Sequence, residues 1–164
     1  MPLFRSLLVV FMALGACSQA DRFGPGATGS DAAGAPGSVD DPQSAAYFSA
    51  TIGDRVLFAV DQSTLTPTAR ATLDGQAEWL TVNAEYVALV EGHADEQGTQ
   101  AYNLALGARR ASTVQNYLIS QGVDPTRLQT ISYGKERPIE ICSEEACYMQ
   151  NRRAVTVLSI GAGL

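Results

Sequence analysis

The chain has 164 residues, of which 17 are acidic and 11 are basic, and its formal net charge is −6. Phosphate backbones repel a chain with this charge, so nucleic acid is excluded as an expected partner. Once the two N-terminal segments described next are set aside, about 110 residues remain. That length is enough for one domain with a single hydrophobic core.

Residues 1–16 have the features of a lipoprotein signal peptide. One basic residue, Arg5, precedes a short apolar run from Leu7 to Leu14, and small residues then lead to Cys17. A transmembrane helix needs about 18 or more apolar residues, so this run is too short. The segment resembles the lipobox of bacterial lipoproteins, which implies cleavage before Cys17 and acylation of that cysteine. Aspartate after the cysteine commonly marks retention in the inner membrane, so Ser18 implies sorting to the outer membrane. The alternative is an ordinary secretory signal with an incidental cysteine.

Residues 17–49 are expected to form the lipidated N-terminus and a flexible linker, with the folded domain at residues 50–164. Between Ser18 and Ala46 the chain is rich in glycine, proline, alanine and aspartate and has almost no large apolar residue. This composition cannot form a hydrophobic core. A tether of about thirty residues spans roughly 30 Å on average and stretches to about 100 Å. The domain is therefore expected to work at a distance from its anchor.

The rest of the chain alternates strand and helix patterns. Strands are predicted at Arg55–Val60, Tyr86–Gly92, Leu128–Tyr133 and Ala154–Ser159. The first helix should start at Thr66 as N-cap, with a buried face formed by Ala69, Leu73, Ala77 and Leu80. Further helices are predicted from Asn103 to near Gly122 and around Glu145–Asn151. This order predicts a sheet with several parallel strands and with helices on one face.

One acid and two polar residues are expected to meet after the second strand. Asp95 follows that strand in a loop, and Asn103 and Arg110 lie seven residues apart on the next helix. At roughly 100° per residue these two return to nearly the same helix face, where both can face Asp95. Arginine pairs bidentately with a carboxylate and aspartate accepts from an ammonium, so the group suits a zwitterion. The buried stripe of this helix is expected at Leu104, Ala108, Ala111, Val114 and Leu118.

Three blocks of sequence resemble, in the same order, the OmpA-like peptidoglycan-binding domain family. They are Gly92–Ala111 around Asp95, Ser132–Pro138, and Asn151–Val155. The resemblance covers roughly Arg55–Leu158 and is closest to the peptidoglycan-associated lipoproteins of the Tol-Pal system. It implies an α+β fold, a βαβαβ-type two-layer sandwich with a mixed sheet and helices on one face.

The same resemblance implies a ligand and a site. Residues that match Asp95 and Arg110 bind diaminopimelate of the peptidoglycan stem peptide in this family. The pocket is completed by residues that match Asn103, Leu106, Ala94, Phe58 and Ala59. This chain departs from the family pattern at two positions, since aspartate usually stands at Ala59 and arginine at Gln97. Some contacts of the relatives are therefore expected to be missing here or to be supplied by backbone groups.

The function implied is that of a non-enzymatic outer-membrane lipoprotein that binds peptidoglycan and ties the membrane to the wall. TolB and other Tol-Pal components would be its partners, with a role in envelope integrity and cell division, and no cofactor is implied. One alternative is an OmpA-like lipoprotein of another envelope or secretion assembly. A cell-wall hydrolase is the other, and it would need two carboxyls roughly 5 to 10 Å apart, such as Asp95 with Glu91 or Glu96. His93 has no partner motif for catalysis, so a structural role is expected.

The cysteines divide into one lipidation candidate and one pair. With Cys17 assigned to lipid, Cys142 and Cys147 remain as an even pair in an exported chain, which predicts a disulfide. A zinc site would need four ligands, and no histidine or further cysteine lies nearby in sequence. Closing so short a loop stabilises the fold by only about 2 kcal/mol, so the bridge should mainly rigidify the segment before Asn151.

Overall fold

The computed structural model describes residues 35–161. The predicted signal peptide, the lipidation candidate Cys17 and the first part of the predicted linker lie outside the described residues. In residues 35–161, none of the helices combines the length and the apolar character that crossing a membrane requires.

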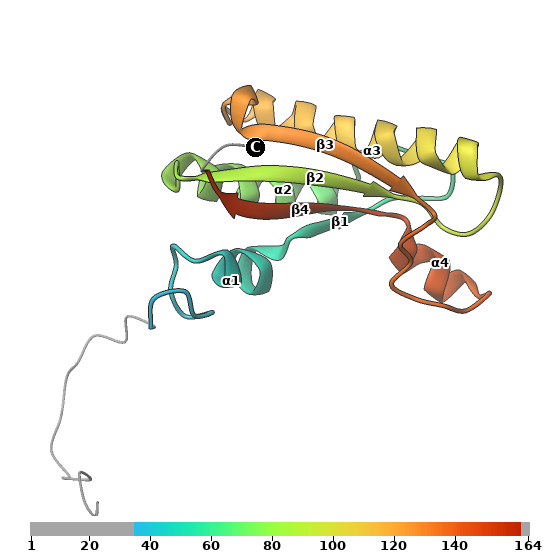
Figure 1. Cartoon of the computed structure of the whole chain (residues 1–164), viewed down its shortest axis with the longest axis horizontal. Coiled ribbons are helices and arrows are strands. Elements are labelled where there is room, and N and C mark those ends of the chain that lie inside the picture. Colours follow the sequence, from blue (N-terminus) through green and yellow to red (C-terminus); the bar gives the residue numbers. More distant parts are fainter. Residues whose placement is uncertain (1–34, 162–164) are drawn as a thin grey trace, which may run out of the picture. The chain divides into compact units, whose positions relative to one another are not determined.

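A four-stranded mixed sheet forms one layer of the domain (Figure 1). Its strands are β1 (Arg55–Leu57), β2 (Tyr86–His93), β3 (Leu128–Gly134) and β4 (Arg153–Ile160), in the spatial order β1-β4-β2-β3. β2 and β3 pair in parallel, whereas β4 is antiparallel to both β1 and β2. Three strands therefore run in one direction with β4 reversed among them. The predicted α+β fold with a mixed sheet is confirmed, although β2 and β3 are the one parallel pair of neighbours in the described sheet.

Two long helices, α2 (Pro67–Val82) and α3 (Gln100–Ser120), cover one face of this sheet (Figure 1). Their apolar side chains share one core with those of the strands, which includes Val56, Leu73, Leu80, Ala88, Val90, Val114, Leu118 and Ala154. The predicted start of α2 is confirmed, because the Thr66 side chain accepts a hydrogen bond from the backbone N–H of Ala69. All four residues predicted for its buried face are buried.

The shorter helical segments surround this two-layer body. They are α1 (Ala45–Tyr47), a π-helical turn at Phe48–Gly53, a 3-10 turn at Pro125–Arg127, and α4 (Glu145–Asn151). Phe48 is fully buried in the core, and the Trp79 indole donates to the carbonyl of Pro42 at 2.7 Å. The packed body thus includes residues that the sequence analysis assigned to the linker. The adjacent aromatic residues Tyr47 and Phe48, at the end of the predicted linker, are the sign of this in the sequence.

Cys142 and Cys147 form the predicted disulfide, with their Cα atoms 5.9 Å apart. The bridge joins the loop after β3 to the first half of α4. Next to it, the Asn151 side chain accepts from the backbone N–H groups of Ile139 and Glu140 and donates to the carbonyl of Glu140. The bridge and this asparagine together fix the segment that leads into β4.

The predicted buried stripe of α3 is wrong in its first half. Leu104 is 50% exposed and Ala108 is also exposed, whereas Asn103, Leu106, Gly107 and Arg110 are buried. The reason is the close approach of α3 to β2. A Cβ atom on Gly92 would lie 1.9 Å from the backbone oxygen of Gly107, and one on Gly107 would lie 2.8 Å from the oxygen of Gly92. The backbones touch here, so α3 turns the face with Gly107, Asn103 and Arg110 toward the sheet, and Leu104 lies on the exposed side.

Replacing Gly92 by alanine should therefore be costly. We expect Gly92→Ala to lower the free energy of unfolding by about 1–3 kcal/mol or more, because α3 must move away from β2. Urea unfolding followed by circular dichroism measures this loss. Gly75→Ala in α2 is the matched control: its Cβ would meet only one side-chain methyl group, that of Ile52 at 3.3 Å, and alanine favours the helix. Equal stabilities of the two variants would contradict the contact between α3 and β2.

Candidate functional site

A cavity of about 240 Å³ opens where the loop after β2 meets the N-terminal half of α3 and the loop after β1. Four of the predicted site residues, Asp95, Asn103, Leu106 and Arg110, line it together. The other lining residues are Val60, Asp61, Gln97, Gly98 and Tyr102. The sequence analysis missed Asp61 and Tyr102, although both lie close in sequence to residues it singled out.

Arg110 forms the floor of this cavity and has no exposed surface. Its guanidinium donates to the carbonyl oxygens of Gln62 at 2.8 Å, His93 at 2.7 Å and Ala59 at 3.1 Å, and it stacks 5.1 Å from the ring centre of Phe58. Burial lowers the pKa of Arg110 to about 10, so the side chain remains cationic at neutral pH. An arginine has five N–H groups, so two are left for a ligand.

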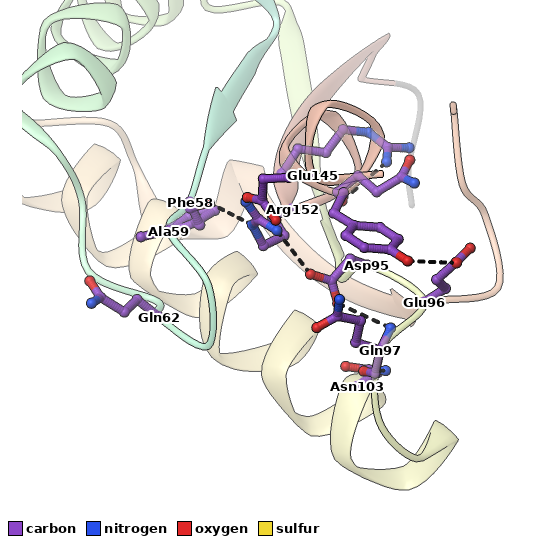
Figure 2. Close-up of polar contacts among 12 residues, drawn as sticks. Phe58, Ala59, Gln62, Asp95, Glu96, Gln97, Asn103, Glu145 and Arg152 are labelled. Carbon is purple, nitrogen blue, oxygen red and sulfur yellow. Dashed lines mark hydrogen bonds and ion pairs between the residues drawn. The ribbon is translucent and has the colours of Figure 1, made fainter. Parts of the chain in front are cut away.

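Asp95 is held by Arg152, which stands just before β4. Its Oδ2 atom lies 3.1 Å from Nη1 of Arg152, and its Oδ1 atom accepts from the backbone N–H of Gln97 at 3.3 Å (Figure 2). Among the ion pairs of residues 35–161, none joins Asp95 to Arg110. Asp95 and Arg110 line the same cavity without forming an ion pair with each other.

Arg152 is buried and uses all three of its guanidinium nitrogens. Besides Asp95, it contacts the carboxylate of Glu145 on α4 and the carbonyl of Phe58 at 3.3 Å (Figure 2). Burial lowers the pKa of Arg152, but the hydrogen bonds that it donates to the carboxylates of Glu145 and Asp95 outweigh this effect and raise the pKa overall. Arg152 stands in the third sequence block, Asn151–Val155, to which the sequence analysis gave no role in the site.

The loop that carries Asp95 is fixed from three sides. Asn103 donates from its side-chain amide to the carbonyl of Gln97 at 2.8 Å, and Lys135 donates to the carbonyls of Glu96 and Gly98. The Glu96 carboxylate accepts from the hydroxyls of Ser143 and Tyr148, which lie close to the disulfide in sequence. The rim of the cavity is therefore tied to α3, to the end of β3 and to α4.

Three predicted site residues lie outside this cavity. Phe58 and Ala59 line a neighbouring groove of about 530 Å³ between β1, α2 and α4, and Ala59 reaches Arg110 only through its carbonyl oxygen. Ala94 is buried, and its backbone N–H donates to the carbonyl of Gly134. These three residues thus support the floor and the rim and do not line the opening.

His93 and the carboxylates proposed for hydrolysis do not assemble into a catalytic group. His93 is 2% exposed, packs against the ring of Tyr133, and lies 3.6 Å from the carboxylate of Glu91. Neither Glu91 nor Glu96 lines the cavity. Desolvation, together with the nearby positive charges of Arg153 and Arg137, lowers the pKa of His93 from 6.5 to about 4. The imidazole is therefore neutral at pH 7, and neither of its nitrogens has a hydrogen-bond partner in the described residues.

Comparisons with known proteins agree with this architecture. The OmpA family matches residues 57–153. The peptidoglycan-associated lipoprotein of Mesorhizobium japonicum is 55% identical over 74% of this chain and 72% of its own length. The lipoprotein of the same name from Rhizobium meliloti is 46% identical over 95% of this chain and 86% of its own length.

Solved structures show the same fold. The crystal structure of the peptidoglycan-associated lipoprotein from Burkholderia pseudomallei has a TM-score of 0.67 at 33% identity and covers 73% of this chain and 100% of that one. The C-terminal domain of Helicobacter pylori MotB has a TM-score of 0.62 at 24% identity, covering 66% of this chain and 86% of that one. The MotB likeness concerns the fold alone.

The low pKa of His93 predicts that acid weakens the fold. The unfolded chain takes up a proton near pH 6.5 and the folded chain only near pH 4, so stability is complete above pH 6.5 and falls as the pH drops toward 4. We expect wild type to lose about 2–3 kcal/mol more than His93→Phe between pH 7 and pH 4.5. Urea unfolding of both proteins at the two pH values measures this difference. Parallel losses would contradict a buried neutral imidazole.

Proposed function

Because the chain belongs to the OmpA family, within the group of peptidoglycan-associated lipoproteins, we propose that it binds peptidoglycan without covalent linkage and ties the outer membrane to the wall. The observation that carries this proposal is the cavity, in which a buried arginine and two carboxylates lie within one small opening. The relatives are named for association with peptidoglycan and not for a reaction, and the chain is accordingly a non-enzymatic protein.

The cavity suits the zwitterionic end of diaminopimelate in a stem peptide. A ligand carboxylate that reaches the floor would meet the two N–H groups that Arg110 has left, in a place where low polarity strengthens the attraction. Asn103 and Leu106 would line the path to it, one polar and one apolar. Asp95 and Asp61 supply the negative side of the cavity for an ammonium group. A ligand that carries both charges fits better than either an anion or a cation alone.

The anchor and the partners belong to the same proposal. Acylation of Cys17 and export past the inner membrane would place the domain in the periplasm below the outer membrane. TolB and the other Tol-Pal components would then be its protein partners, with a role in envelope integrity and cell division. The oxidised state of Cys142 and Cys147 supports export, because disulfides persist in oxidising compartments.

Sacculus binding tests the site directly. We expect Arg110→Ala to weaken binding by about 2–5 kcal/mol, because the ligand carboxylate loses its partner at the buried floor. Arg109→Ala removes the same charge from the preceding residue of α3, which is exposed, and should cost less than about 1 kcal/mol. The measurement is co-sedimentation with purified sacculi, with circular dichroism to show that each variant is folded.

Equal losses for Arg109→Ala and Arg110→Ala would mean general attraction of basic residues to an acidic wall, and would overturn the site. The same samples test the hydrolase alternative. A fall in the turbidity of the sacculi would indicate cleavage of the wall, whereas sedimentation of the protein with unchanged turbidity indicates binding.

The proposed anchor has its own test. We expect Cys17→Ser to abolish acylation and to release the protein from outer-membrane fractions, because the lipid chains are its membrane attachment. Mass spectrometry and membrane fractionation measure this. Ser18→Asp keeps the lipidated cysteine and should move the protein to the inner membrane, which separates anchoring from sorting. Outer-membrane recovery of Cys17→Ser at unchanged mass would contradict the lipobox.

A further inference from the structure

The segment that the Cys142–Cys147 disulfide closes, residues 142–147, contacts the loop after β2 at one rim of the cavity. The hydroxyl of Ser143, between the two cysteines, donates to Oε1 of Glu96 at 3.1 Å. The hydroxyl of Tyr148, directly after Cys147, donates to the same oxygen at 3.2 Å. Both hydrogen bonds lie on the exposed surface, where ordering the side chains offsets much of the gain. Such contacts persist only if the backbone on each side is already held in place.

A further contact from the bridged segment reaches the site through Arg152. The carboxylate of Glu145, also between the cysteines, binds the guanidinium of Arg152, and that guanidinium binds Asp95 at 3.1 Å (Figure 2). The Glu145 side chain is 65% exposed, so water competes for it and the ion pair contributes little by itself. The bridged segment thus supports the loop after β2 directly, through Glu96, and indirectly, through Arg152.

Without the bridge, little would hold this segment in place. Residues 143–146 are all exposed, so no buried apolar side chain anchors them. α4 has seven residues and no side-chain cap at its start, and a helix this short is marginal in water by itself. Asn151 ties only its far end, through the backbone of Ile139 and Glu140. The disulfide is therefore the link that keeps Glu145 and Tyr148 opposite their partners.

We propose that the Cys142–Cys147 disulfide positions the loop after β2 for ligand binding, and that its reduction by a dithiol lowers the affinity for peptidoglycan without unfolding the domain. This inference rests on the proposed function and adds redox control to it. Both cysteines are partly exposed, so a dithiol can reach the bridge. One thiolate of the dithiol attacks a sulfur and breaks the S–S bond, and the second displaces the protein from the mixed disulfide. Two electrons and two protons pass to the protein as two thiols, and the dithiol becomes a disulfide.

Other contacts keep the domain folded and part of the rim in place after reduction. Neither cysteine belongs to the hydrophobic core of the described domain. Lys135 still donates to the carbonyls of Glu96 and Gly98, and Asn103 still donates to that of Gln97. Reduction therefore frees the loop to move within limits. Ligand binding must then order the loop again, and that entropy cost weakens the affinity.

Co-sedimentation of the full-length protein with sacculi, before and after dithiothreitol, tests this coupling. We expect reduction to weaken binding about three- to tenfold, the range for losing three exposed polar contacts. The Cys142→Ser/Cys147→Ser variant should bind like the reduced protein and should not respond to dithiothreitol. The triple variant Ser143→Ala/Glu145→Gln/Tyr148→Phe keeps the bridge but removes the three contacts. It should bind like the reduced protein even when oxidised, and change little on reduction.

Glu144→Gln serves as the control for charge, because Glu144 is an exposed acid of the bridged segment and forms no ion pair in residues 35–161. This variant should keep the wild-type response to dithiothreitol. An equal response of the triple variant and the wild type would overturn the proposal. Loss of the folded circular dichroism spectrum of the wild type on reduction would also overturn it, because the bridge would then hold the whole fold.

Backbone nitrogen-15 relaxation of the free protein gives a second measurement, which needs no ligand. Reduction should lower the order parameters of residues 95–98 and leave those of β2 and β4 unchanged. Unchanged order parameters in residues 95–98 would overturn the positioning role. Oxidised wild type that does not bind sacculi would overturn the proposed function, whereas the relaxation data would still decide whether the bridge positions the loop.

Discussion

The hydrogen bonds from the buried guanidinium of Arg110 to three backbone carbonyls hold the site together. They join α3 to the loop after β1, through Ala59 and Gln62, and to the end of β2, through His93. Burying a cation is costly, and here three carbonyl oxygens and the nearby charges of Asp95 and Asp61 offset that cost. The cavity exists because these three segments cannot separate without leaving the arginine unpaired.

A second arginine performs the same task at the opposite end of β2. Arg127 donates to the carbonyls of Leu80, Asn83 and Tyr86, which joins the end of α2 to the start of β2. Arginine suits both places because its planar fork reaches several carbonyls at fixed angles. The two residues have different consequences for function. Arg127 only joins two structural elements, whereas Arg110 joins segments that border the cavity.

The sequence predicted the elements and part of the site, and its failures have physical causes. Helical periodicity correctly placed Asn103 and Arg110 on one face of α3, because that relation is local. The periodicity wrongly predicted that Leu104 is buried. The buried face of α3 is set by the long-range contact of Gly107 with Gly92 of β2, which periodicity does not reveal. The partner of Asp95 was also missed. Arg152 is 57 residues away in sequence and reaches Asp95 only because β4 lies between β1 and β2.

The two departures from the family pattern, Ala59 and Gln97, show which parts of the site depend on side chains. Ala59 contacts Arg110 through its carbonyl, and Gln97 contacts Asp95 and Asn103 through its backbone N–H and carbonyl. Any residue supplies these groups, so the scaffold of the cavity tolerates substitution at both positions. Asp61, two residues after Ala59 in the chain, is the carboxylate of this loop that lines the cavity.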